Sequence, residues 1–349
     1  MAYGGPMPHK TFFAFILPSL LVMTLFIALP ILSVAMQSFF VEHEQVIETI
    51  ESCGPFGCTQ QVRVDAAAMA ELREEAPLGR FNGLGTYLDA RHLAVDEVEA
   101  AWRSSGDLGE FLRNLMNLPF YKALGFTLIY TAVVTPLVIV LGLFIAAGVN
   151  AIPKLLKGPI IFFSLLPMIV TPLVGSLVLF WMIDENGVIG ATLQVIFDDP
   201  QLSLRASPAL TWIVLMVYGV WHMLPFSFLV FYAGLQTVPS DTLESAIIDG
   251  ANRWERMRDV VVPHLMPLVT FVALVQLMDN FRVFEPILGF QASADATTLS
   301  WLIFNDLRGA DQPLFGSAAA TSLLTIFGIF VLLMPVLVRT WRDFSRKAV

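Results

Sequence analysis

Six long apolar segments dominate this chain and most constrain what it can fold into. A helix needs about 20 residues to cross a hydrocarbon core about 30 Å thick, and each segment is long enough for that crossing. The segments are Phe12–Phe39, Ala123–Val149, Pro159–Ile183, Ala209–Leu235, Val261–Val283 and Leu314–Val338. Charged residues make up only 14% of the 349 residues, against about 25% in soluble domains. We therefore expect an all-α membrane protein with six transmembrane helices.

Lys and Arg in the short loops predict the orientation, because cytoplasmic loops carry an excess of these cations. The short outer loops, 184–208 and 284–313, would hold only Arg205 and Arg308. The inner segments would hold Lys10, Lys154, Lys157, Arg253, Arg256, Arg258, Arg339, Arg342, Arg346 and Lys347. The prediction is a multi-pass protein of a bacterial-type cytoplasmic (inner) membrane, with both termini in the cytoplasm.

The first apolar segment has an alternative interpretation as a cleaved signal peptide. It is longer than a usual signal-peptide core, and Ser33-Val34-Ala35 is a poor cleavage site, so a membrane anchor is favoured.

The distribution of charged, glycine and proline residues divides the chain into four regions. Val64–Glu75 and Val95–Met116 alternate apolar and charged residues with helical spacing, which predicts a small, mostly helical extracytoplasmic insertion. The regions are an N-terminal part with the first span (1–40), this insertion (41–119), a five-helix transmembrane core (120–338) that includes a loop at 238–263, and a cytoplasmic tail (339–349).

Both cysteines of the chain lie in this insertion. Cys53 and Cys58 flank Gly-Pro-Phe-Gly, a sequence that favours a tight turn, so a local disulfide is sterically plausible. Disulfides persist outside the cytoplasm, and the alternative is a pair of free thiols. Two thiols without neighbouring histidines do not predict a metal site.

A polar segment separates the fourth and fifth spans. It mixes acids with arginines and holds small residues at Ser245, Ala246, Gly250 and Ala251. One alternative is an amphipathic helix that only anchors the loop at the membrane surface. The small residues and acids interrupt the broad apolar face that such a helix needs, which favours a segment that docks in the groove of a partner.

The local structure of this segment can be predicted from its capping residues. Ser240 or Asp241 is suited to cap a short helix, which Gly250 either ends or uses to let another backbone approach closely. A second short helix is expected over Arg253–Val260. Pro263 then lies near the start of the fifth span, where a missing N–H costs least.

The spacing Glu-x-Ala-x-x-Asp-Gly-Ala, then eleven residues and Pro, resembles the coupling-loop signature of ABC importer permeases. The matched residues are Glu244, Ala246, Asp249, Gly250, Ala251 and Pro263, with Ser245 where Ala is usual. Segments 81–87, 120–131 and 315–320, together with Gly187, also resemble the maltose-type, or type I, carbohydrate permeases. The resemblance extends over most of the chain.

Two features depart from that pattern. Residues 88–118 look like an insertion between motifs that are usually adjacent, and the Gly-Gly-Pro expected after the fifth span is replaced by Gly289-Phe290-Gln291. Both departures concern the outer gate and the substrate class rather than the coupling segment.

The resemblance implies that the coupling segment docks into a separate ATPase subunit. It implies four kinds of partner: a second permease, two ATPase subunits, an extracytoplasmic solute-binding protein and membrane lipid. The chain contains no P-loop, not even a Gly-Lys pair, and no His-Glu-x-x-His set, so it is not expected to be an enzyme or to hold a metal. ATP and Mg²⁺ would bind the partner ATPase, and the net charge of −9 opposes nucleic-acid binding.

Polar residues inside the fifth span are candidates for contact with the transported solute. Gln276, Asp279 and Asn280 share one helix face with Val283, and Arg282 is placed to pair with Asp279. The matching stretch of maltose-type permeases lines the sugar site. The alternative is polar contact between helices, which Asn and Gln often supply in membranes.

A second candidate cluster lies in the fourth span. Tyr218, Trp221 and His222 flank Pro225, and a proline kink frees backbone groups that often border a cavity. The alternative is ordinary packing of the two aromatic rings and the histidine.

These patterns predict the permease subunit of an ATP-driven importer for a sugar or a related polyhydroxylated solute. Sugar, oligosaccharide, polyol and glycerol phosphate are all compatible with it. The alternative function is a secondary transporter driven by an ion gradient, with Asp279 as the coupling site. Such transporters often show inverted repeats and broken helices, and the sequence shows neither.

Overall fold

The computed structural model describes residues 9–54, 57–309 and 312–347 of the chain. Residues 1–8 and 348–349 of the predicted terminal regions lie outside this description. The chain divides into two compact units. The first unit is Met1–Phe111 with Ile303–Leu324, and the second is Leu112–Leu302 with Thr325–Val349.

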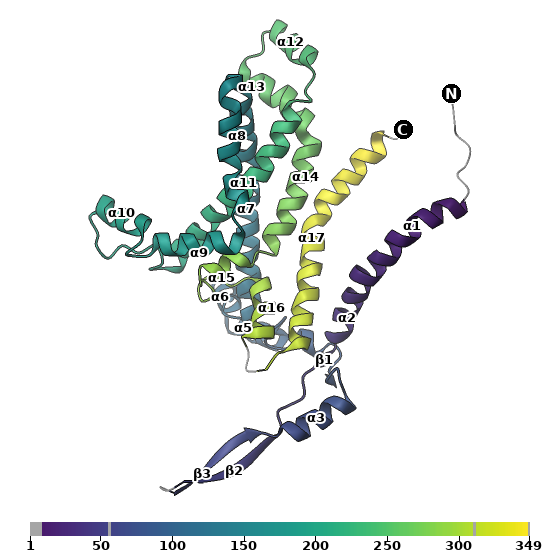
Figure 1. Ribbon diagram of the computed structural model, residues 1–349, viewed down its shortest axis with the longest axis vertical. Coiled ribbons are helices and arrows are strands. Elements are labelled where there is room, and N and C mark those ends of the chain that lie inside the picture. Colours follow the sequence, from purple (N-terminus) through teal and green to yellow (C-terminus); the bar gives the residue numbers. More distant parts are fainter. Residues whose placement is uncertain (1–8, 55–56, 310–311, 348–349) are drawn as a thin grey trace. The chain divides into compact units, whose positions relative to one another are not determined.

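The second unit is helical, and its long helices α7, α11 and α14 pack against one another, with α8 against α11 (Figure 1). Its elements are α7 (Pro119–Ala151), α8 (Lys154–Ile169), α9 (Pro172–Ile183), α10 (Val188–Phe197), α11 (Pro208–Leu235), α12 (Ser240–Ile248), α13 (Arg253–Arg256), the π-helical η2 (Met257–Val261), α14 (Val262–Phe281) and α15 (Glu285–Gly289). Three helices belong partly to each unit: α6 (Leu108–Leu115), α16 (Leu299–Arg308) and α17 (Phe315–Lys347).

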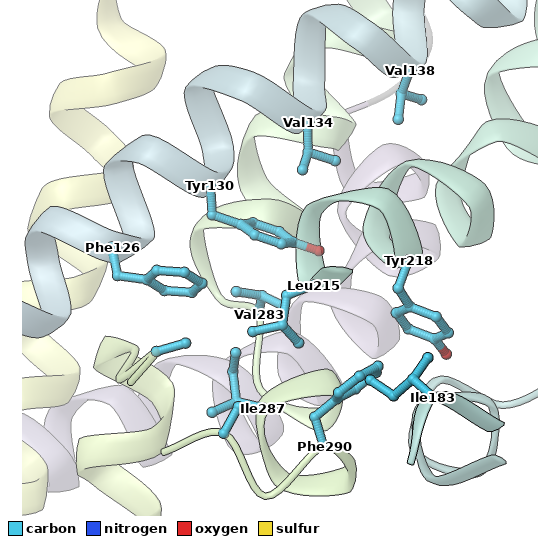
Figure 2. Close-up of a cluster of buried hydrophobic side chains, with 12 residues drawn as sticks. Phe126, Tyr130, Val134, Val138, Ile183, Leu215, Tyr218, Val283, Ile287 and Phe290 are labelled. Carbon is cyan, nitrogen blue, oxygen red and sulfur yellow. The ribbon is translucent and has the colours of Figure 1, made fainter. Parts of the chain in front are cut away.

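A buried hydrophobic cluster joins α7, α11 and the segment that follows α14 (Figure 2). Tyr130 of α7 extends toward α11, where a Cβ on Gly219 would lie only 2.0 Å from its hydroxyl oxygen. In the other direction, a Cβ on Gly142 of α7 would lie 2.8 Å from the Cβ of Ser227 on α11. Small residues at helix contacts let two membrane helices approach closely, so these glycines allow the α7–α11 contact.

The third predicted span, Pro159–Ile183, is interrupted. Helix α8 ends at Ile169, and α9 begins at Pro172, with Thr171 extended at φ −62° and ψ 142°. Proline disfavours the helical conformation in the residue before it, which explains a break at Thr171. The candidate span in this region starts at the break and covers Pro172–Phe197.

The first unit combines the N-terminal helices with short strands and helices. Its further elements are α1 (His9–Met23), the π-helical η1 (Thr24–Ala28), α2 (Leu29–Gln37), β1 (Phe40–Val41), β2 (Ile47–Gly54), β3 (Gly57–Val64), α3 (Ala66–Glu75), β4 (Arg80–Phe81), α4 (Gly85–Leu88) and α5 (Val95–Ser104). The predicted helix over Val95–Met116 is two helices, α5 and α6, separated around Gly106, because glycine is a poor interior helix residue.

An antiparallel hairpin of β2 and β3 was not predicted from the sequence. Its register pairs Ile47 with Val64 and Thr49 with Val62, and β-branched residues of this kind favour strands. The backbone positions of Cys53 and Cys58 lie directly opposite each other in the same register. This arrangement is compatible with the predicted disulfide, which stays a prediction.

The described part of the chain contains six helical stretches that are long and apolar enough to cross a membrane, which confirms the predicted fold class. They are Phe13–Gln37, Pro119–Ala151, Pro172–Phe197, Pro208–Leu235, Arg253–Phe281 and Phe315–Arg342.

Candidate functional site

Helix α12 lies beyond the ends of α11 and α14, next to the short helix α13 (Figure 1). The N-cap of α12 is Pro239, and no side chain caps this end. The prediction that Ser240 or Asp241 caps the helix is therefore wrong. Pro239 occupies that position with an extended backbone, and the Ser240 hydroxyl donates to the Asp241 carboxylate instead, at 3.2 Å.

The other end of α12 closes in a Schellman motif. The N–H of Ala251 donates to the carbonyl of Ala246 at 2.9 Å, and the N–H of Gly250 donates to the carbonyl of Ile247 at 3.0 Å. This motif needs a residue with positive φ, and Gly250 has φ +82°. A Cβ on Gly250 would meet no atom of the described chain within 4 Å. Glycine is therefore required at this position by the backbone conformation and not by a lack of space for a side chain.

A capping box starts α13 immediately afterwards. The Asn252 Oδ1 accepts hydrogen bonds from the N–H groups of Trp254 and Glu255, both at 2.9 Å. In return, the Glu255 Oε2 accepts from the Asn252 N–H at 2.7 Å. Because these bonds satisfy the free N–H groups of the helix start, they fix the turn between α12 and α13.

Helix α13 continues without interruption into the span. The expected second helix over Arg253–Val260 passes directly through the π-helical η2 into α14. The Val262 N–H donates to the Met257 carbonyl five residues back, and the next residue is Pro263, which lacks an N–H. The N-terminal span has the same arrangement, since its π turn η1 ends just before Pro30.

The surface of this coupling segment is largely exposed. Glu244, Ser245 and Asp249 are exposed, whereas Ala246 and Ala251 are half-buried. Three large apolar side chains that were not singled out from the sequence are exposed as well: Ile247 at 53%, Ile248 at 85% and Trp254 at 72%. The two adjacent isoleucines inside the matched motif could have indicated exposed apolar side chains on α12.

Gln276 and Asn280 point into the helix bundle. Both are buried, and the Asn280 Nδ2 donates to Thr135 Oγ1 of α7 at 3.0 Å and to Gln276 Oε1 at 3.4 Å. These contacts match the alternative of polar contact between helices. The Asn280 Oδ1 is a buried acceptor with no partner among the described residues.

Asp279 has different surroundings. Its carboxylate accepts a hydrogen bond from Arg282 at 2.7 Å, and the two side chains are 31% and 57% exposed. The sequence pattern predicts one helix face for Asp279, Val283, Gln276 and Asn280. Val283 is not on this helix, because α14 ends at Phe281.

The cluster around Pro225 is held by packing. The Tyr218 hydroxyl donates to the carbonyl of Pro172 at 2.7 Å, and therefore ties α11 to the break before α9. The rings of Tyr218 and His222 stack with their centroids 5.9 Å apart, whereas Trp221 is 46% exposed. Within the described chain, the buried Nδ1 of His222 has no hydrogen-bond partner.

The described residues contain no group of three or more His, Cys, Asp or Glu side chains that could hold a metal ion.

Comparison with known proteins identifies the family. Residues 119–343 match the family model described as the binding-protein-dependent transport system inner membrane component. The chain is 30% identical over 240 residues to the probable ABC transporter permease protein y4oQ of Sinorhizobium fredii, covering 66% of this chain and 74% of that one. It is 29% identical over 217 residues to the multiple sugar-binding transport system permease protein MsmF of Streptococcus mutans, covering 60% and 73%.

A solved structure supports the same fold. A bacterial ABC transporter involved in the import of the acidic polysaccharide alginate aligns with a TM-score of 0.57 at 20% identity, over 72% of this chain and 88% of that chain. The structural alignment supports the fold, and the matched family model supports the family. The chain belongs to the family of inner membrane components of binding-protein-dependent transport systems, and is a permease subunit of an ABC importer.

Proposed function

We propose that this permease moves a sugar or a related polyhydroxylated solute, and that α12 receives the motion of a separate ATPase subunit. The observation that supports the proposal is that α12 is exposed but rigidly connected to the fifth span. Most of the helix surface is exposed, and its connection to the fifth span is nevertheless fixed by hydrogen bonds that the consecutive N–H groups of Gly250, Ala251 and Asn252 donate.

Such a connection is suited to transmit displacement. A flexible loop would absorb a movement of α12, whereas the Schellman motif and the capping box leave little freedom between Ile248 and Arg253. From Arg253 to Phe281 the chain is one helical stretch. Movement of α12 would therefore shift the fifth span, whose C-terminal end carries Gln276 and Asn280 and meets α7 through the Asn280–Thr135 bond.

The second permease, two ATPase subunits and a solute-binding protein would complete the importer, with ATP and Mg²⁺ on the ATPases. The excess of Lys and Arg in loops on the α12 side supports a cytoplasmic position for α12 and both termini. Residues 41–119 would then face the solute-binding protein's compartment.

The solute class rests on two kinds of support. MsmF, a relative, is named for multiple sugar-binding transport. In this chain, the unpartnered Asn280 Oδ1 and the half-exposed Asp279 supply acceptors, and hydroxyl-rich solutes offer donors to both. We propose these two residues, with Gln276, as solute contacts on α14, and Tyr218, Trp221 and His222 as the aromatic border.

Proteoliposomes that contain the permease with its partner subunits test the energy source. Solute uptake should require ATP on the α12 side and should not respond to an imposed proton gradient alone. Uptake driven by the gradient without ATP, and lost in Asp279→Asn, would instead establish the secondary-transporter alternative.

A further inference from the structure

Two adjoining cavities in the first unit differ in the chemistry of their walls. The larger, called the polar cavity, is about 490 Å³ and has mixed walls, in which Gln37, Glu42, His43, Arg73 and Gln312 lie among apolar residues such as Met69, Leu78 and Phe315. The smaller, about 270 Å³, is bordered mainly by apolar groups such as Val34, Ile303 and Leu307. The volume of the larger cavity is within the range of small-molecule sites.

The residues shared by the two cavities mark an edge of the membrane. Gln37 and Phe315 line both. Gln37 is also the last residue of the first candidate span, and Phe315 is the first residue of the sixth. The apolar cavity therefore lies at the level of the hydrocarbon core, and the polar cavity lies at the level of the lipid headgroups. Figure 1 shows α2, α3 and the start of α17, which contribute to these walls.

The polar cavity presents both signs of charge. None of the ion pairs among the described residues includes Arg73, an exposed residue that lines the cavity. Glu42 is held in place, because its Oε1 accepts from the N–H of Gly316 at 2.8 Å. His43 is held by a 2.9 Å bond between its Nε2 and the carbonyl of Ala76.

We propose that these cavities bind one phospholipid with an ethanolamine headgroup, from the leaflet on the side of residues 41–119. The phosphate would pair with Arg73, the ammonium would donate to Glu42, and an acyl chain would lie along Ser33, Val34 and Leu307. Guanidinium groups are strong phosphate ligands. A purely anionic headgroup fits less well because the Glu42 carboxylate would repel it. A choline headgroup has no N–H to donate to that carboxylate.

Native mass spectrometry of the full chain, purified and stripped of lipid, tests the headgroup. Phosphatidylethanolamine, phosphatidylcholine and phosphatidylglycerol are titrated separately, and the first should be retained about tenfold more strongly than the others. Arg73→Gln should weaken the retention of all three lipids, because each of them carries the phosphate that would pair with Arg73. Arg80→Gln is the matched control, because Arg80 is an exposed arginine of the same unit that pairs with Glu44 outside the cavity lining. Equal retention of all three lipids, or loss in the control alone, would overturn the proposal.

A second pair of variants tests the acyl position. Ser33→Trp places a large ring in the apolar cavity at an exposed position, so the fold should tolerate it while lipid retention falls about tenfold. Ser19→Trp changes an exposed serine of α1 that lines neither cavity, and should retain lipid normally. Unchanged retention in Ser33→Trp, with the variant folded by its melting temperature, would contradict the acyl assignment.

Discussion

The N–H of Ala251 donates to the carbonyl of Ala246 at 2.9 Å, and this bond ends α12 one residue before the next helix is capped. Only four residues, 249–252, therefore separate the two helices, and they form no flexible spacer. The small side chains of the matched motif have a role in the local backbone structure, in addition to the docking role that the family resemblance implies. They let the chain turn sharply while both helix ends keep their hydrogen bonds satisfied.

Gly250→Ala should loosen this turn, because an L-residue with a Cβ is disfavoured by about 1–2 kcal/mol in the left-handed region. Amide hydrogen exchange at residues 250 and 251 should quicken by about tenfold, and Gly250→Asn should have a smaller effect. Gly148→Ala is the control, since Gly148 is a helical glycine of α7 whose added Cβ would also meet no atom within 4 Å. Exchange that is equally slow in Gly250→Ala would contradict the assigned role.

Asn252→Ala should weaken the start of α13 by about 1 kcal/mol, because the N–H groups of Trp254 and Glu255 lose their acceptor. Hydrogen exchange at these two amides is the measurement. Glu255→Gln keeps a side chain that can accept from Asn252 and should leave exchange almost unchanged. A loss of protection in Glu255→Gln but not in Asn252→Ala would rule out the capping box as the stabilising element.

Sequence patterns predicted the elements that depend on local rules. The apolar runs indicated the spans, and the Gly250 position indicated the end of α12. They failed where tertiary contacts decide. Thr171 breaks a span that hydropathy treats as continuous, and helical periodicity alone could not tell that Asn280 faces α7 while Asp279 pairs outward with Arg282. The capping box was visible as Asn-x-x-Glu at 252–255, but its effect is clear only once the helix before it is placed.

Asn280→Ala should lower the free energy of unfolding by about 1 kcal/mol, because the buried hydrogen bond to Thr135 is lost. A double-mutant cycle with Thr135→Val isolates that bond.

Asp279→Ala removes an ion pair whose two side chains are partly exposed, so stability should change little while solute uptake falls. Unchanged uptake in Asp279→Ala and Asn280→Ala would end the assignment of both residues as solute contacts.

Gly219→Ala should destabilise the α7–α11 contact by about 1–3 kcal/mol, because the new methyl group would lie 2.0 Å from the Tyr130 hydroxyl oxygen. Adding Tyr130→Phe removes that oxygen and should restore part of the loss in melting temperature. Gly148→Ala again serves as the control. If Gly219→Ala melts like the wild-type protein, the glycine does not set this packing distance.

Co-purification of a P-loop ATPase with Ile248 variants tests the central claim most directly, because Ile248 is the most exposed apolar side chain of α12, at 85%. The wild-type permease and Ile248→Leu should both retain the ATPase in stable complex after solubilisation. Ile248→Glu should lose it while the permease itself stays folded. Equal retention of the ATPase by Ile248→Glu and Ile248→Leu would contradict α12 as the docking helix.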